Sequence, residues 1–298
     1  MDKEITISGQ KVKLTNLEKI FWPEEKITKG DLIEYYADVA KYILPHLKDR
    51  PQSLHRFPDG IRGEGFYQKN YEDAPKWVKQ VKIHSESDGK NVNYLVCQNE
   101  ADLLFLVNLG CIDLNPWNSH IGHLNYPDYL IIDLDPEDVP FRNVIEVALA
   151  TKKVLGKFDI PTFPKTTGLR GMHILIPTAA KYTYEQVRNL AEVLVTLIHK
   201  EVPEITSLER HPEKRHKKVY LDYLQNSEGQ TIASAYSIRP AAKAPVSTPL
   251  RWNEVTKSIN PEDFTIKNTK NRLKKIGDIF KPVLSKGIDI KRILAKIK

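Results

Sequence analysis

The chain has 298 residues, of which 41% are hydrophobic and 28% are charged, and its formal net charge is +7. This composition is typical of a globular protein, and the length allows one large domain or two smaller lobes. No run approaches the roughly 20 apolar residues of a membrane span, and the opening MDKEITISGQ lacks the apolar core of a signal peptide. We therefore expect a cytoplasmic protein with no membrane partner.

Helical and strand-like patterns alternate along the chain. Thr28 and Asp31 form a capping-box pattern that predicts the start of a helix, and this helix is expected to end near Pro45. Apolar residues recur at helical spacing in three segments, 29–47, 142–156 and 184–201. Strand-like runs occupy 92–97, 129–135, 172–176, 219–224 and 231–238. The alternation predicts an α/β or α+β fold built on a mostly buried sheet.

The two cysteines carry no sign of metal chemistry. Cys97 and Cys111 have no His or Cys neighbour at metal-ligand spacing, and both lie beside apolar residues. We expect two buried free thiols rather than a disulfide or a zinc site.

Positive charge is concentrated at the C-terminal end. From Lys267 to Lys298 there are eleven Lys or Arg residues against two Asp, a local charge of +9 that leaves the remainder near −2. Such a segment often contacts nucleic acid. Apolar residues between Ile276 and Leu284 recur at helical spacing, so a solvated amphipathic helix pair explains the segment equally well. We predict a two-lobed domain over 1–265 and a basic helical extension over 266–298.

Two carboxylates end the apolar run YLIIDLD at 129–135. Alternate residues of a strand point to the same face, so Asp133 and Asp135 project together while Leu134 is buried behind them. Like charges at this spacing raise each other's pKa unless a cation lies between them. A turn at Asp135, which precedes Pro136, is the structural alternative.

A third carboxylate lies in the strand-like run VYLDYL. Asp222 needs a partner there because burying an unpaired charge is costly, and Arg215 or Lys218 could supply one. If this strand lies beside 129–135, three carboxylates surround one point. Oxygen ligands of this kind suit Mg²⁺ or Mn²⁺, and two such ions can activate an attacking oxygen and stabilise a leaving one.

The segment KTTGLRGMHILIP at 165–177 predicts a phosphate-binding turn. Its glycines and threonines expose backbone N–H groups, and Lys165 and Arg170 flank them. It does not match the P-loop pattern. His173 follows on the strand and points away from Met172, as a ligand or as a satisfied core histidine.

Two further basic elements follow along the chain. Arg239 in YSIRP could clamp a second phosphate or form a surface ion pair. The run ERHPEKRHKK at 209–218, which contains Arg215, is either a solvated loop or a contact to a nucleic-acid backbone.

The ordered set DYLIIDLDPED, TTGLRGMHILIP, KVYLDYLQN and AYSIRP resembles the polymerase domain of bacterial and archaeal ATP-dependent DNA ligase D. This domain is the non-homologous end-joining branch of the archaeo-eukaryotic primase superfamily. The stretches TNLEKIFWPEEKITKGDLIEYY, RPQSLHRFPDGIRGEGFYQKN, NPWNS and IGDIFKPVLSKGIDI extend the resemblance over nearly the whole chain. It implies an α+β, primase-like catalytic core with mixed or antiparallel sheets flanked by helices.

The resemblance also implies residue roles. Asp133, Asp135 and Asp222 would hold two metal ions, Mn²⁺ or Mg²⁺. The incoming NTP or dNTP would be bound by Thr167, Arg170, His173 and Arg239, with Lys165, Gln225 and Asn115 as further candidates. The DNA-binding residues would be Lys19 and Lys29, which grip a 5′-phosphate, Tyr67 and Phe66, which offer an aromatic surface for a base, and Lys69 and Arg215.

The implied activity is a nucleotidyltransferase that extends DNA 3′ ends and fills gaps at 5′-phosphorylated breaks, favouring ribonucleotides. Asn115 departs from the family, where several members carry His near the nucleotide sugar, and this weakens the expected ribonucleotide preference. The implied partners are broken DNA, a Ku-type end-binding protein and a DNA ligase, in a nucleoid-associated setting. The alternatives are a metal-dependent nuclease, or a non-catalytic protein that bridges DNA ends.

Overall fold

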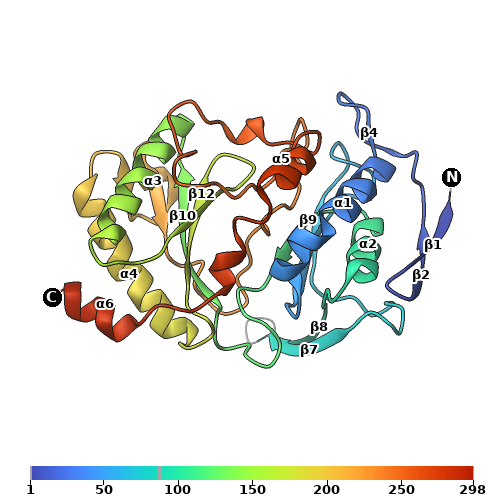
Figure 1. The fold of residues 1–298 in the computed structure, drawn as a ribbon, viewed down its shortest axis with the longest axis horizontal. Helices are drawn as coiled ribbons and strands as arrows, with labels where there is room; N and C mark the ends of the chain where they lie inside the picture. The colour runs from blue at the N-terminus through green and yellow to red at the C-terminus, as the bar shows by residue number, and fades with distance from the viewer. Residues whose placement is uncertain (1, 86–88, 298) are drawn as a thin grey trace. The chain divides into compact units, whose positions relative to one another are not determined.

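Residues 2–85 and 89–297 are described by a computed structural model of the chain (Figure 1), and they form two units that are each assembled from three stretches of sequence. The first unit contains Met1–Ile121, Thr231–Ser247 and Phe264–Asp278. The second contains Gly122–Gln230, Thr248–Asp263 and Ile279–Lys298. The predicted basic segment 266–298 is therefore divided between both units, and its last residue lies outside the described residues.

A five-stranded mixed sheet forms the centre of the second unit. Its strand order is β11 (Phe163–Thr166), β12 (Met172–Pro177), β10 (Tyr129–Pro136), β14 (Val219–Asp222) and β13 (Thr206–Ser207). All neighbours pair antiparallel except β13 and β14, which are parallel. The apolar runs predicted at 129–135 and 172–176 are thus central strands.

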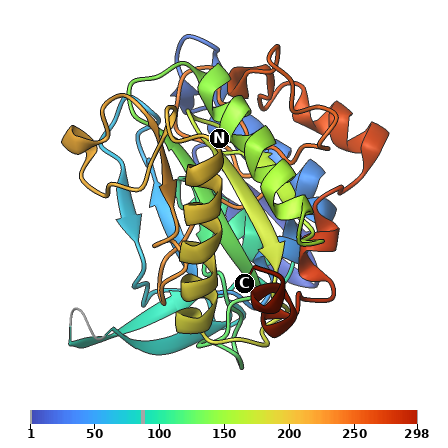
Figure 2. The ribbon, with the colours of Figure 1, turned by 90° about the vertical axis from the view of Figure 1, so that its left-hand side faces the viewer.

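Two helices cover one face of this sheet. Figure 2 shows α3 (Phe141–Gly156) and α4 (Tyr184–Glu201) side by side in front of the strands. Leu130, Ile132 and Leu134 of β10 are completely buried and point away from the two carboxylates. They form the apolar face against which the helices pack, which leaves the opposite face for polar side chains.

The first unit packs two helices against a three-stranded sheet. Helix α1 (Lys29–Leu47) begins with the predicted capping box, in which Thr28 and Asp31 exchange hydrogen bonds. Helix α2 (Glu100–Asn108) lies against α1 and against strand β9 (Cys111–Pro116). The sheet has the order β6 (Phe66–Gln68), β5 (Gln52–Arg56) and β9.

Hairpins and short helices complete the described chain. The paired strands are β1 (Lys3–Ile7) with β2 (Gln10–Leu14), β3 (Ile20–Trp22) with β4 (Ile27–Thr28), and β7 (Gln80–Ser85) with β8 (Lys90–Leu95). The C-terminal helices are α5 (Thr269–Ile276) and α6 (Ile290–Ile297). Single 3-10 turns cover Pro212–Lys214, Pro261–Asp263 and Lys281–Leu284.

The helices and most strands confirm the sequence predictions to within about two residues at each end, with three larger differences. The predicted strand 231–238 is wrong: it makes only isolated bridges, and Tyr236 has a φ of 69°, which breaks an extended chain. The helical spacing from Ile276 to Leu284 does not form one helix, because α5 ends before Gly277, whose φ is 67°. Helix α2 was not predicted from the apolar pattern, although Asn99 is a typical capping residue at its start.

The remaining expectations concern the thiols and the membrane. Cys97 and Cys111 are free and buried, as predicted. Within residues 2–85 and 89–297, none of the helices combines the length and the apolar character that crossing a bilayer requires.

Candidate active site

Four polar side chains form a row across the sheet of the second unit. Asp133 of β10 lies directly opposite Asp222 of β14 on one side and opposite His173 of β12 on the other. His173 in turn lies opposite Lys165 of β11. Residues that pair across antiparallel strands point to the same face, so all four side chains share the face opposite the helices. The predicted neighbour relation between Asp133 and Asp222 is confirmed by this register.

Asp135 extends the row along β10. It lies opposite Tyr220, two residues before Asp222, so it shares the face of Asp133. The guanidinium of Arg215 contacts it, with 3.1 Å between Nη1 and the Asp135 Oδ2, and the same nitrogen lies 3.4 Å from a Glu137 oxygen. Arg215 also covers the ring of Tyr220, at 4.1 Å from its centroid. A cation thus balances part of the carboxylate charge.

Arg215 is itself almost completely buried. Its Nε and Nη2 groups donate to the backbone oxygens of Glu209 and Arg210. The structure therefore places Arg215 with the carboxylates and the loop that carries it, rather than on a surface open to a nucleic-acid backbone.

The carboxylate of Asp222 is affected by burial and by a neighbouring negative charge. It accepts a hydrogen bond of 2.7 Å from the backbone N–H of Leu224. Burial is the main cause that raises its pKa above the ordinary value, and the charge of Asp135 raises it further. On the other side of the row, Nε2 of His173 lies 3.4 Å from Oδ1 of Asp133. Asp222 and Asp135 therefore repel each other, and a cation between them would relieve this repulsion.

The donor set fits a hard divalent cation in its chemistry and in the sheet face that it shares. Three carboxylates share one sheet face, and carboxylate oxygens are the ligands that Mg²⁺ and Mn²⁺ prefer. In the described part of the chain, however, no group of three or more His, Cys, Asp or Glu is arranged so that it could hold a metal ion. Asp135 turns to Arg215 and Asp222 turns to the Leu224 N–H, so each carboxylate has a protein partner instead.

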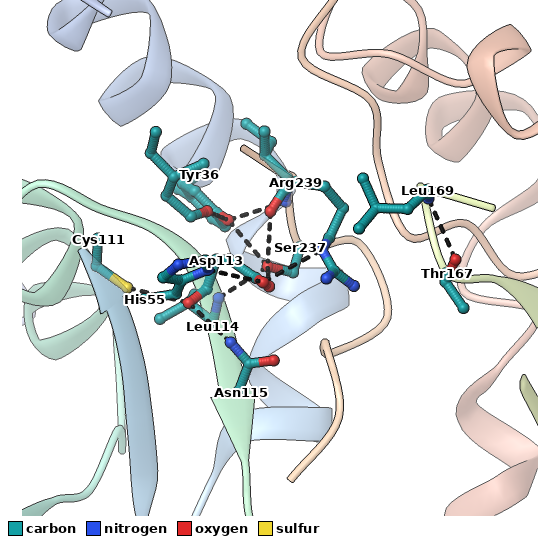
Figure 3. Close-up of polar contacts among 12 residues, drawn as sticks. Tyr36, His55, Cys111, Asp113, Leu114, Asn115, Thr167, Leu169, Ser237 and Arg239 are labelled. Atoms are coloured by element: carbon teal, nitrogen blue, oxygen red, sulfur yellow. Dashed lines mark hydrogen bonds and ion pairs between the residues drawn. The ribbon is translucent and has the colours of Figure 1, made fainter. Parts of the chain in front are cut away.

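The predicted phosphate turn joins β11 to β12 beside this row. The Thr167 hydroxyl accepts hydrogen bonds from the backbone N–H groups of Leu169, at 3.2 Å (Figure 3), and Gly171, at 3.1 Å. Gly168 has a φ of 75°, which favours glycine. Arg170 is exposed at the tip, whereas Lys165 is buried at the base. The turn is thus shaped by its own threonine and presents one exposed cation, Arg170, to solvent.

Gln225 lies in the turn that directly follows β14. It is partly exposed and comes three residues after Asp222. Strand β14 ends at Asp222, two residues earlier than predicted, and Gln225 lies outside the sheet.

Arg239 and Asn115 belong to the first unit and meet a buried carboxylate there. The Nε of Arg239 lies 3.2 Å from Oδ2 of Asp113, which is completely buried in β9 (Figure 3). The Asn115 side chain donates to the backbone oxygen of Asp113 at 3.1 Å. Arg239 therefore forms a buried ion pair. The sequence had suggested either a phosphate contact or an ion pair on the surface.

Lys19 and Lys29 form a pair of cations at the start of α1. The backbone N–H of Lys29 donates to the carbonyl oxygen of Lys19, and its Nζ donates to the Thr15 hydroxyl at 3.2 Å. Lys19 is paired with the exposed carboxylate of Asp59. Burial, and then the charge of Lys19, lowers the pKa of Lys29 to about 8. The charge of Lys19 thus acts on Lys29, and an anion bound by both lysines would relieve this repulsion.

The aromatic pair lies on edge strand β6. Phe66 and Tyr67 are both exposed, and the exposed Lys69 follows the strand. The Tyr67 ring stacks on His55 of β5, with 4.1 Å between centroids and 10° between planes. The Arg56 guanidinium lies over the Phe66 ring at 5.3 Å. Sequence reasoning missed Asp113, His55 and Tyr220, although a carboxylate inside the apolar strand CIDLNP was a visible signal.

The comparison with known proteins now decides the family. A model of the LigD primase-polymerase domain matches residues 28–280. The chain belongs to this family. A primase-polymerase domain is a DNA-directed nucleotidyltransferase, so the chain is an enzyme of that class. Such enzymes use a nucleoside triphosphate and a divalent metal ion.

Relatives of this LigD family chain include two whole proteins and one solved domain. The "Bifunctional non-homologous end joining protein LigD" of Bacillus subtilis is 36% identical over 270 residues, which are 90% of this chain and 43% of that protein. The "Multifunctional non-homologous end joining protein LigD" of Pseudomonas aeruginosa is 29% identical over 89% of this chain and 32% of that protein. The chain thus spans less than half the length of these relatives.

The solved structure is the polymerase domain of Mycobacterium tuberculosis ligase D in complex with DNA. It matches with a TM-score of 0.85 and 25% identity over 94% of this chain and 100% of that chain. The α+β, primase-like fold and the family that the motifs predicted are therefore confirmed.

Proposed function

We propose that this chain is a template-dependent repair polymerase and primase that extends DNA 3′ ends and fills gaps at 5′-phosphorylated breaks in non-homologous end joining, favouring ribonucleotides. The observation that carries the proposal is the register of β10 with β14, which supports Asp133, Asp135 and Asp222 as one set of metal ligands. The names of the relatives, which describe end-joining proteins, support the repair context.

The three carboxylates would hold two divalent ions, with Mn²⁺ preferred over Mg²⁺. Bound ions would lower the pKa of a primer 3′-hydroxyl and neutralise charge on a triphosphate. Arg215 contributes by balancing the charge of Asp135, which limits repulsion within the carboxylate set.

The polar residues around the carboxylates would bind and orient the triphosphate. Arg170 is exposed at the tip of the turn that Thr167 shapes, so it can reach a phosphate with little rearrangement. His173 and Lys165 add donors in the same sheet row, and Gln225 follows it. We assign Arg239 to the phosphates and Asn115 to the sugar as well. Catalysis would then come from positioning and electrostatics rather than from a covalent intermediate.

DNA would be held by the first unit. We assign the 5′-phosphate to Lys19 and Lys29, and a stacked base to Tyr67 with Phe66. Lys69, exposed after β6, would contact the backbone. Base stacking is tolerant of sequence, which suits the repair of arbitrary ends. A Ku-type end-binding protein and a DNA ligase are the partners that this role requires.

Primer extension on a gapped, 5′-phosphorylated duplex tests the proposed activity. With Mn²⁺ present, and with NTPs and dNTPs supplied in separate reactions, we expect extension with both and faster extension with NTPs. Extension that prefers dNTPs would show that Asn115 does not support ribonucleotide selection. Shortening of the primer without any extension would overturn the polymerase and favour a nuclease.

Binding of the 5′-phosphate is expected to weaken as the pH rises through about 8. Below that pH Lys29 is protonated and attracts the phosphate, and above it the free protein must take up a proton to do so. Binding of gapped DNA measured by fluorescence anisotropy from pH 7 to pH 9 checks this. The same duplex without its 5′-phosphate should show a much smaller change in affinity with pH. In Lys29→Arg, the affinity for the phosphorylated duplex should no longer fall between pH 7 and pH 9. An equal pH effect on both duplexes would contradict the assignment.

A further inference from the structure

A second cross-strand row runs through the sheet of the first unit. Tyr67 of β6 lies opposite His55 of β5, and His55 lies opposite Asp113 of β9. The three side chains therefore share one face of the sheet. Tyr67 stacks in parallel on His55, and Nδ1 of His55 lies 3.7 Å from Oδ2 of Asp113. An exposed ring is in this way connected to a buried charge through one imidazole.

The same carboxylate oxygen also faces Arg239. Oδ2 of Asp113 lies 3.2 Å from Nε of Arg239, and the Arg239 side chain is itself only 14% exposed. Burial by itself would raise the pKa of Asp113, but the charge of Arg239 and the contact with His55 outweigh it and lower the pKa below its ordinary value. Asp113 therefore stays ionised, with one oxygen between the Arg239 guanidinium and the His55 imidazole.

Buried hydroxyl groups hold Asp113 in place. Ser237 lies with its Oγ 3.2 Å from Oδ1 of Asp113, and the same hydroxyl accepts the backbone N–H of Leu114 (Figure 3). The Tyr36 hydroxyl donates to the carbonyl oxygen of Ile112 at 2.6 Å and lies 3.3 Å from the Ser237 hydroxyl. A carboxylate that is fully buried and surrounded in this way has little freedom to move.

We propose that Asp113 is a positioning residue that aims the Arg239 guanidinium and, through His55, orients the Tyr67 ring. Neither Asp113 nor His55 contacts substrate in this proposal. One fixed charge would then set the geometry of a nucleotide-binding side chain and of a DNA-stacking side chain at the same time. The inference rests on the proposed function, because that function assigns Arg239 to the triphosphate and Tyr67 to DNA.

The first test is Asp113→Asn in the full chain. We expect the KM for the incoming NTP and the Kd for gapped DNA each to rise by about tenfold, because Arg239 and Tyr67 lose their common anchor, while kcat at saturation changes by less than about threefold. The matched control is Asp102→Asn. Asp102 is also a buried carboxylate of the first unit, but it accepts the backbone N–H of Gln98 just before α2. This control should leave both constants unchanged.

A double-mutant cycle separates positioning from a general loss of structure. If Asp113 acts through Arg239, Asp113→Asn should add little to the KM of Arg239→Gln, whereas independent effects would multiply. His55→Phe keeps an aromatic ring for Tyr67 but removes the link to Asp113. It should raise the DNA Kd and leave the KM for NTP unchanged, and it tests the proposal even if Asp113→Asn does not fold.

The outcomes also distinguish this inference from the proposed function. If Arg239→Gln leaves the KM for NTP unchanged, the nucleotide assignment of Arg239 fails. If Arg239→Gln raises the KM but Asp113→Asn does not, or if the two effects multiply, the positioning role of Asp113 is overturned. A normal DNA Kd in His55→Phe would likewise overturn the connection to Tyr67.

Discussion

Asp222→Asn is expected to lower the rate of primer extension by at least about a thousandfold, while binding of gapped DNA is retained. The substitution removes one of three metal-ligand carboxylates, and catalysis by bound ions depends on the complete set. It preserves the shape of the side chain, and the amide oxygen can still accept the Leu224 N–H. Single-turnover extension with Mn²⁺, together with anisotropy of gapped DNA, measures the two effects separately.

The same substitution is expected to leave thermal stability unchanged or to raise it. The pKa of Asp222 is raised in the folded protein by burial and by Asp135, so its ionised form opposes folding at neutral pH. Asn carries no such penalty. A loss of activity together with a large fall in melting temperature would mean that Asp222 serves the fold instead.

Asp138→Asn is the matched control for this experiment. Asp138 follows β10 closely, is exposed and pairs only loosely with Lys217, at 3.5 Å. Its φ of 50° is one that Asn tolerates well. Extension by this variant should stay within about twofold of the original protein, since surface changes of this kind have small effects. A comparable loss in both variants would contradict the special role of Asp222.

Gly171→Ala is expected to disturb both the fold and the site. A Cβ at this position would lie 2.4 Å from the carbonyl oxygen of Leu134, which is a backbone atom between the two carboxylates of β10. Either β10 or the turn must move, at a cost of about 1–3 kcal/mol or more in the free energy of unfolding. We expect a lower melting temperature and a strongly reduced extension rate, measured by calorimetry and single-turnover kinetics.

Gly156→Ala, in the same unit, is expected not to destabilise the protein. A Cβ there meets no atom within 4 Å, and the residue lies at the end of α3. The free energy of unfolding should be unchanged or higher by up to about 1 kcal/mol, because alanine restricts the unfolded chain. If Gly171→Ala behaved like Gly156→Ala, the close packing of the turn against β10 would not be required for activity.

Local patterns in the sequence determined the helices and the faces of the strands. Period-two alternation was enough to place Asp133 and Asp135 together, because side chains of a strand alternate by geometry. Helical spacing predicted α1, α3 and α4, and a capping box predicted the start of α1, since both signals arise within a few residues. The same local signals failed at 231–238 and at Ile276 to Leu284. There, a positive φ at Tyr236 and at Gly277 interrupts the pattern.

Tertiary structure decided which side chains meet. Strand register places Asp222 opposite Asp133. Contacts between residues distant in sequence bring Arg215 to Asp135. In the same way, Asp113 lies between Arg239 and His55. Residues 113 and 239 are far apart in sequence, and no local pattern records their contact. Sequence by itself therefore determined the types of chemistry this protein carries, because residue types and spacing set them. Only the folded chain decided how those groups balance one another, because charge compensation depends on distances across the sheet.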